Sequence, residues 1–305
     1  MEHRQFGATD MQVSVLGFGG AEIGFASSPV DNVSRLLQAA LDNGLNVIDT
    51  AECYGTGEEL LGKAVAHRRN EFHLFTKCGH GGLREELPTD VQSVEDWDAR
   101  LLNASIERSL RRLQTDHVDL LQLHSCDEEI LRRGEVIEVL ERARDAGKTR
   151  YIGYSGDNEA ALYAVECGRF DTLQTSLNVA DQRAIELFLP QALERNMGVI
   201  AKRPIANVAW KYSSAEDAGY GGPYWERFQE LQYPFLQGEM NAAVAQALQF
   251  TLHVPGVHTA IVGTSNPERW PQNAALLKQS FSDEEYQAIR ARWQEIAASD
   301  WVAQT

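Results

Sequence analysis

Short apolar runs alternate with helical patterns along almost the whole chain. The runs expected to form strands occupy residues 13–19, 45–50, 71–77, 117–124, 149–155, 171–176, 197–202 and 259–263. Several of these eight runs are almost continuously apolar, which is typical of parallel strands covered on both faces rather than of half-exposed antiparallel strands. The pattern therefore predicts eight parallel strands joined by helices.

The segments between the runs have the periodicity of amphipathic helices. Residues 33–43 place five apolar side chains on one helical stripe, namely Val33, Leu36, Leu37, Ala40 and Leu41. Gly44 follows as a C-terminal stop, and residues 135–146 repeat the arrangement with Gly147 at the end. The sequence Ser-Asp-Glu-Glu from Ser282 opens a predicted final helix that reaches about residue 298.

The spacing of the runs favours one fold class. Successive strand ends are 20 to 61 residues apart, about one strand–helix unit each, and eight such units most simply close into an α/β, (β/α)8 TIM barrel. An open doubly wound sheet is the alternative, but the glycines of residues 17–24 break the G-x-G-x-x-G spacing at Glu22. We expect residues 1–305 to form a single domain, with an N-terminal β-hairpin that turns near residues 8–10 and caps the amino-terminal mouth of the barrel.

The longest interval holds a loop at about residues 203–239, after the seventh barrel strand. Its aromatic residues are compatible with two roles, a mini-core under the loop and a wall of the substrate site; they are Trp210, Tyr212, Tyr220, Tyr224, Trp225, Phe228, Tyr233 and Phe235. Loops that follow barrel strands line the catalytic face, so an insertion there is where specificity tends to be built.

Composition and charge exclude several function classes. With 43% hydrophobic and 24% charged residues, the chain can bury a globular core. The net charge of −16 argues against a nucleic-acid partner, because phosphate-backbone affinity needs a basic surface. No apolar stretch approaches the roughly 20 residues that span a bilayer, and residues 1–12 do not resemble a signal peptide. We therefore expect a soluble, cytoplasmic protein with no membrane partner.

The cysteines indicate free thiols in a reducing compartment, because no two of them form a C-x-x-C pair. Cys53, Cys78 and Cys126 lie close in sequence to residues that we single out below, but their spacing matches no closed zinc pattern. The sequence therefore predicts no metal site.

Four polar residues stand at or just beyond the ends of consecutive predicted strands: Asp49, Tyr54, Lys77 and His124. A barrel brings such ends together. A tyrosine phenol is a weak acid near neutrality, but a nearby ammonium such as that of Lys77 stabilises the phenolate and lowers its pKa. The Asp49 carboxylate would keep the lysine charged, and His124 could orient a carbonyl oxygen beside the phenol. The set is suited to protonating a developing alkoxide.

The motifs around these residues resemble successive signatures of the aldo-keto reductase superfamily. They are DTAECYG followed by GEELLG (residues 49–62), FTKCG (75–79), DLLQLH (119–124) and IGYSG (152–156). Their order and spacing also agree, from the N-terminal hairpin to about residue 273. The resemblance implies a (β/α)8 barrel that binds NADP(H) or NAD(H) in an extended form and reduces aldehydes or ketones to alcohols.

The resemblance implies a role for each matching residue. Tyr54 would be the general acid, Lys77 and Asp49 would tune its pKa, and His124 would orient the carbonyl group. Ser155 and Gln174 are similar to the residues that bind the nicotinamide carboxamide. The family often has Asn directly after that serine, whereas this chain has Gly156 and then Asp157.

Two further segments are similar to cofactor-binding parts of the family. Residues 261–273, IVGTSNPERWPQN, resemble the adenosine-phosphate loop, whose cofactor-binding positions here are Gly263, Thr264, Ser265, Arg269 and Asn273. Arg269 favours NADPH/NADP+, with NADH/NAD+ possible, because a guanidinium pairs with the 2′-phosphate, although Gly263 replaces a frequent lysine. Lys202 and Arg203 stand where many members have an aromatic ring. We interpret Lys202 or Arg203 as a pyrophosphate partner, and the alternative is that either is only a solvated strand end.

The leading hypothesis is an NADPH-dependent reductase of an aldehyde or ketone. An NAD(P)-dependent dehydrogenase of an aldose or other secondary alcohol is the alternative on the same site. A slow, cofactor-binding redox-sensor subunit is a third hypothesis, weakened by the intact set of four residues. The sequence predicts a small-molecule carbonyl or alcohol substrate without identifying it, and it gives no oligomeric state.

Overall fold

The computed structural model describes residues 1–26, 28–80 and 82–304. Its centre is a closed barrel of parallel strands in the order β10-β3-β4-β5-β6-β7-β8-β9. The strands are β3 (Leu16–Gly19), β4 (Val47–Asp49), β5 (His73–Cys78), β6 (Val118–His124), β7 (Thr149–Ser155), β8 (Thr172–Ser176), β9 (Gly198–Lys202) and β10 (Thr259–Gly263). The predicted (β/α)8 barrel is therefore confirmed.

The register of the strands places their carboxyl ends on one rim. His124 pairs with Ser155, and Ser155 pairs with Gln174. The barrel closes where β10 pairs with β3, with Gly263 opposite Gly19. Polar residues at the ends of different strands therefore meet at the same mouth, which is the catalytic face of barrels of this kind.

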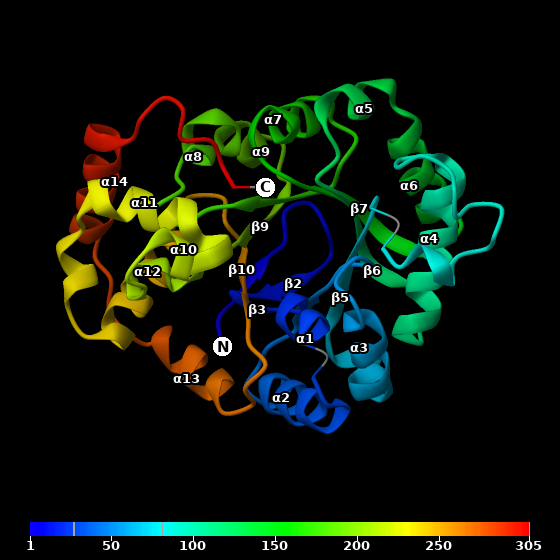
Figure 1. The fold of residues 1–305 in the computed structure, drawn as a ribbon, viewed down its shortest axis with the longest axis horizontal. Helices are drawn as coiled ribbons and strands as arrows, with labels where there is room; N and C mark the ends of the chain where they lie inside the picture. The colour runs from blue at the N-terminus through cyan, green and yellow to red at the C-terminus, as the bar shows by residue number, and fades with distance from the viewer. Residues whose placement is uncertain (27, 81, 305) are drawn as a thin grey trace.

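Helices surround the barrel on its outer side (Figure 1). They are α1 (Ala21–Phe25), α2 (Val30–Asp42), α3 (Gly57–Val65), α4 (Ala99–Leu113), α5 (Glu128–Arg133), α6 (Glu135–Asp145), α7 (Asn158–Glu166), α8 (Ala184–Leu187), α9 (Leu189–Glu194), α10 (Ala215–Ala218), α11 (Gly222–Leu231), α12 (Met240–His253), α13 (Arg269–Leu276) and α14 (Asp283–Ile296). The buried residues of α2 are the five of the predicted stripe. Gly44, just beyond its end, has φ +86°, a left-handed conformation that glycine adopts without strain.

The N-terminal hairpin closes the bottom of the barrel. β1 (His3–Gln5) pairs antiparallel with β2 (Gln12–Ser14). Side chains from this hairpin and from four barrel strands form one buried cluster of Phe6, Met11, Val13, Val47, Phe75, Leu120 and Ile200. The predicted strand 13–19 is wrong at its start, because residues 13–14 pair within the hairpin and the barrel strand begins at Leu16. The amino-terminal mouth is thus filled by apolar side chains.

The long loop after β9 folds into short helices, α10 and α11 together with the 3₁₀ helices η3 (Ala206–Lys211), η4 (Gly219–Gly221) and η5 (Pro234–Gln237). Tyr224, Phe228 and Tyr233 belong to the main buried core. By contrast, Tyr220 is 59% exposed. The first three residues therefore have a core role, as part of the main core rather than of a separate one, whereas the exposed Tyr220 accepts a hydrogen bond from Arg203.

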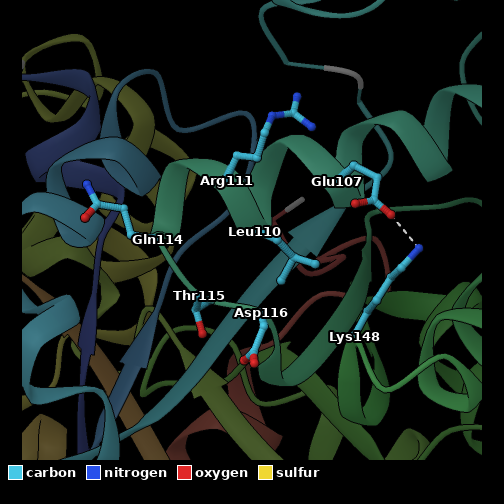
Figure 2. Close-up of a pocket in the computed structure, with 7 residues that line it drawn as sticks. All are labelled: Glu107, Leu110, Arg111, Gln114, Thr115, Asp116 and Lys148. Atoms are coloured by element: carbon cyan, nitrogen blue, oxygen red, sulfur yellow. Dashed lines mark ion pairs between the residues drawn. The ribbon is translucent and has the colours of Figure 1, made fainter.

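An open depression lies near the amino-terminal ends of β6 and β7 (Figure 2). It is lined by Glu107, Leu110, Arg111, Gln114, Thr115, Asp116 and Lys148. Asp116 lies two residues before β6 and Lys148 directly before β7, and Lys148 forms an ion pair with Glu107 across the depression. The depression is remote from the carboxyl ends of the strands.

Candidate active site

The four residues of the proposed acid–base set meet at the carboxyl-terminal rim. Asp49 ends β4, Lys77 is the last residue but one of β5, and His124 ends β6. Tyr54 lies in the loop between β4 and α3. This loop packs so tightly against α1 that a Cβ atom on Gly24 would lie 2.0 Å from the Tyr54 carbonyl oxygen. The glycine of this segment thus permits close backbone packing beside Tyr54.

Lys77 lies between the Asp49 carboxylate and the Tyr54 phenol. Its side chain is 1% exposed, and Nζ lies 2.5 Å from Asp49 Oδ1 and donates to the Thr50 carbonyl oxygen at 2.8 Å. The same Nζ is 5.1 Å from the centroid of the Tyr54 ring. A buried ammonium held by a carboxylate at this distance stabilises negative charge on the phenol.

The protonation states follow from burial and these charges. Burial alone would lower the pKa of Lys77, but the Asp49 carboxylate raises it above its ordinary value, so the ammonium is retained. Burial raises the pKa of Tyr54, and the charge and hydrogen bonding of Lys77 cancel only part of this increase. The net lowering expected for the phenol from the sequence is therefore wrong for the protein without ligand, because desolvation outweighs the neighbouring ammonium.

His124 lies beside Tyr54. The two ring centroids are 5.6 Å apart at an interplanar angle of 82°, and the His124 Nδ1 atom is 3.3 Å from Cys53 Sγ. Burial, together with the positive charge of Lys77, lowers the pKa of His124 well below its ordinary value. The imidazole is therefore neutral near pH 7, a state in which it can form hydrogen bonds but is not a charged acid.

Ser155 and Gln174 are paired next to Asp49. Ser155 Oγ donates to Gln174 Oε1 at 2.8 Å, and Gln174 Nε2 donates to Asp49 Oδ2 at 3.0 Å. Both side chains are buried. The chain of hydrogen bonds fixes the amide in one orientation, with its oxygen toward the serine, and ties it to the acid–base set.

Lys202 and Arg203 lie on the same rim but already have protein partners. Lys202 Nζ is 2.8 Å from Asp157 Oδ2. Arg203 donates hydrogen bonds to Ser176 Oγ and to the Tyr220 hydroxyl. Burial lowers the pKa of Lys202, and the Asp157 carboxylate opposes this effect. The sequence did not reveal these partners, because they lie in other segments. Asp157 follows β7, and Tyr220 lies within the long loop after β9.

The segment resembling an adenosine-phosphate loop lies beside β3 and α1. Thr264 Oγ1 accepts from the Asn266 amide at 3.1 Å, and Arg269 is the first residue of α13. Gly263, Ser265 and Arg269 are exposed, whereas Asn273 is half-buried. A Cβ atom on Gly263 would lie 3.5 Å from Glu22 Cγ, so the acidic side chain of Glu22 lies beside this glycine.

Sequence reasoning missed the aromatic row around Tyr54. The ring centroids of Phe25 and Tyr54 are 5.6 Å apart. The ring centroid of His80 lies 5.1 Å from that of His124 and 5.8 Å from that of Trp97. Phe25 is 67% exposed. The available signal for Phe25 and His80 was a position in the segment that follows a barrel strand. Trp97 offered no such signal, because it stands 19 residues after the end of β5 and two residues before α4.

The end of the chain also reaches the mouth. After α14 it returns across the molecule and finishes beside β9 (Figure 1). There the Gln304 carbonyl oxygen accepts from Ser176 Oγ at 3.1 Å and also from Arg203. No sequence signal indicated this contact.

In residues 1–26, 28–80 and 82–304, no cluster of three or more His, Cys, Asp or Glu residues is arranged to hold a metal ion. Over the same part of the chain, no helix combines the length and apolar character needed to cross a membrane.

Comparison with known proteins agrees with this fold. The sequence model of the aldo/keto reductase family matches residues 15–294. L-galactose dehydrogenase of Arabidopsis thaliana is 29% identical, covering 91% of this chain and 88% of that protein. D-threo-aldose 1-dehydrogenase of a Pseudomonas species is 28% identical, covering 88% and 90%. The solved structure of aldo-keto reductase AKR11C1 from Bacillus halodurans, in its holo form, is similar at TM-score 0.79 and 26% identity, covering 96% of each chain. The chain therefore belongs to the aldo/keto reductase family.

Proposed function

We propose that this protein is an NADPH-dependent reductase that converts an aldehyde or ketone into an alcohol, with Tyr54 as the proton donor. Family membership makes the chain an NAD(P)-dependent oxidoreductase. The observation that carries the finer proposal is the position of Lys77, whose buried Nζ is bonded to Asp49 and lies 5.1 Å from the Tyr54 ring. This arrangement lowers the free energy of a phenolate at the place where a carbonyl oxygen would need a proton.

The donor set fits a nicotinamide dinucleotide. Ser155 and Gln174 present a hydroxyl and an amide beside Asp49, the groups that a carboxamide would bind. Lys202 and Arg203 supply positive charge on the same rim for a pyrophosphate. The start of α13 would receive the adenosine phosphate, with Arg269 at the first helical position and Asn273 toward the adenine. These assignments remain proposals for each residue.

The side chains of the protein divide the work of carbonyl reduction. When bound, the reduced nicotinamide supplies hydride to the carbonyl carbon. Tyr54 gives its proton to the carbonyl oxygen, and Lys77 stabilises the phenolate that remains. Asp49 keeps Lys77 charged in its buried position. The neutral His124 donates a hydrogen bond that orients the oxygen toward the phenol.

The alternative is an NAD(P)-dependent dehydrogenase of an aldose or other secondary alcohol, which uses the same groups in reverse. Two observations favour it. The relatives named above include L-galactose dehydrogenase and D-threo-aldose 1-dehydrogenase. In addition, the Glu22 carboxyl stands beside Gly263, and acidic side chains bind the ribose hydroxyls of NAD in other dinucleotide sites.

Two measurements separate these functions. Fluorescence titration gives the affinities for NADPH and NADH, and steady-state rates are then measured in both directions on a panel of aldehydes, ketones, sugars and their alcohols. We expect faster carbonyl reduction with NADPH. Tyr54→Phe should lower kcat by about 100- to 10,000-fold while the cofactor Kd stays nearly constant. Tyr151→Phe is the matched control, because its hydroxyl lies at the opposite end of the barrel, next to Asp10. A Tyr54→Phe variant that keeps most of its activity would refute the role of Tyr54.

A further inference from the structure

The residue before the proposed acid contacts the histidine of the site. Cys53 Sγ lies 3.3 Å from His124 Nδ1, a hydrogen-bond distance for sulfur. Across the described ranges of the chain, His124 Nε2 has no hydrogen-bond partner. One ring nitrogen is thus engaged by the protein, and the other is available to a ligand.

The direction of this hydrogen bond follows from the protonation of the two groups. Burial raises the pKa of Cys53 to about 11, so it is a neutral thiol near pH 7. The imidazole is also neutral, because burial and Lys77 lower its pKa. A neutral imidazole carries one N–H group and one bare nitrogen, and the bare nitrogen is a better acceptor than sulfur. The favoured arrangement has the thiol donating to Nδ1, which leaves the proton of the ring on Nε2.

We propose that Cys53 is a positioning residue that holds His124 in the Nε2–H tautomer, so that Nε2 donates a hydrogen bond to the carbonyl oxygen of the substrate. The inference rests on the proposed function and deepens it. With the opposite tautomer, a bare Nε2 would face the carbonyl oxygen, and two acceptors would repel each other. Cys53 thus supplies part of the polarity of the site without touching the substrate.

A packing role for Cys53 predicts a different result from a hydrogen-bonding role. Valine fills a similar volume but has no donor, whereas serine keeps a donor in a smaller side chain. If Cys53 only fills space, Cys53→Val should be the milder change. If it acts through its S–H group, Cys53→Ser should be the milder one.

The direct test is nitrogen NMR of protein labelled with ¹⁵N-histidine and free of cofactor, with the His124 signals assigned through His124→Gln. We expect the wild type to carry its proton on Nε2 and to show a hydrogen-bonded, bare Nδ1. In Cys53→Val the Nδ1 signal should move and the Nδ1–H population should rise severalfold, and Cys53→Ser should restore the wild-type pattern. A wild-type ring protonated on Nδ1, or a Cys53→Val spectrum identical to that of the wild type, would overturn the proposal.

Kinetics give a second readout. Cys53→Val should lower kcat about 2- to 10-fold, the range of one net hydrogen bond, with little change in cofactor Kd, and Cys53→Ser should recover most of the loss. Cys167→Val is the matched control, because that thiol bonds to the Ala164 carbonyl oxygen at the end of α7 and should leave kcat unchanged. A wild type that turns over no carbonyl or alcohol would contradict the proposed function. An active enzyme whose kcat and His124 tautomer do not change when Cys53 is replaced would contradict only this inference.

Discussion

Lys202 Nζ lies 2.8 Å from Asp157 Oδ2, with the carboxylate fully buried and the lysine side chain 13% exposed. Asp157 also accepts hydrogen bonds from Thr175 Oγ1 and the Ser176 amide. The carboxylate and the ammonium therefore neutralise each other, since either charge alone would be costly to bury.

The first prediction concerns this pair. Asp157→Ala should lower the free energy of unfolding by about 3–5 kcal/mol, because it leaves a largely buried ammonium without its partner. Urea denaturation measures the loss. The double variant Asp157→Asn/Lys202→Met should recover much of it, since an amide keeps the bonds to residues 175 and 176 and methionine needs no counter-charge. If the double variant is less stable than Asp157→Ala, charge compensation is not what links the two positions.

The second prediction concerns the choice of cofactor. Arg269 is exposed at the first position of α13, where a guanidinium and a helix N-terminus together favour a phosphate. Arg269→Ala should weaken NADPH binding about 10- to 100-fold and NADH binding less than about twofold. Fluorescence titration measures both constants, with Arg100→Ala as a control for the loss of one surface charge. Equal weakening of the two cofactors would place the 2′-phosphate elsewhere.

The third prediction concerns Glu58, a fully buried carboxyl near the start of α3. Burial raises its pKa to about 7, although Thr76 Oγ1 donates to it at 2.7 Å. The folded state therefore holds this proton more tightly than the unfolded state, whose carboxyl has a pKa of about 4.3. The contribution of Glu58 to the free energy of unfolding is fully present below that value and is lost as the pH rises through about 7.

Glu58→Gln removes this titration. The free energy of unfolding of the wild type, relative to that of the variant, should fall by roughly 2–3 kcal/mol between pH 4.5 and pH 8. Urea denaturation at several pH values measures the difference between the two proteins, and other titrating groups cancel in it. Parallel curves for the two proteins would show that Glu58 is already ionised in the folded state.

The sequence was sufficient to predict features whose signal is local or is repeated from one strand–helix unit to the next. The stripe of α2 follows from a 3.6-residue period, and the rim holding Asp49, Lys77 and His124 follows from the fact that parallel strands end on one side of a barrel. The start of the first barrel strand was misjudged, because residues 13–14 and 16–19 are both extended and only tertiary pairing separates them.

Contacts between distant segments could not be predicted. The bond from Arg203 to Tyr220 and the return of residue 304 to the mouth depend on how a long loop and a terminal segment fold back. The net pKa direction of Tyr54 was also beyond reach, because the sequence identifies the neighbouring ammonium but not the depth of burial that opposes it.

The apolar filling under the barrel gives the molecule two functionally unequal ends. The rings of Phe6 and Phe75 stack with their centroids 5.8 Å apart, and with their neighbours they fill the barrel at its amino-terminal end. Substrate and cofactor can therefore reach Tyr54 only from the carboxyl-terminal end. The tip of the hairpin, with exposed Ala8 and Asp10, is then a natural anchoring point. Enzyme immobilised on a surface through that tip should present its working entrance to the bulk liquid.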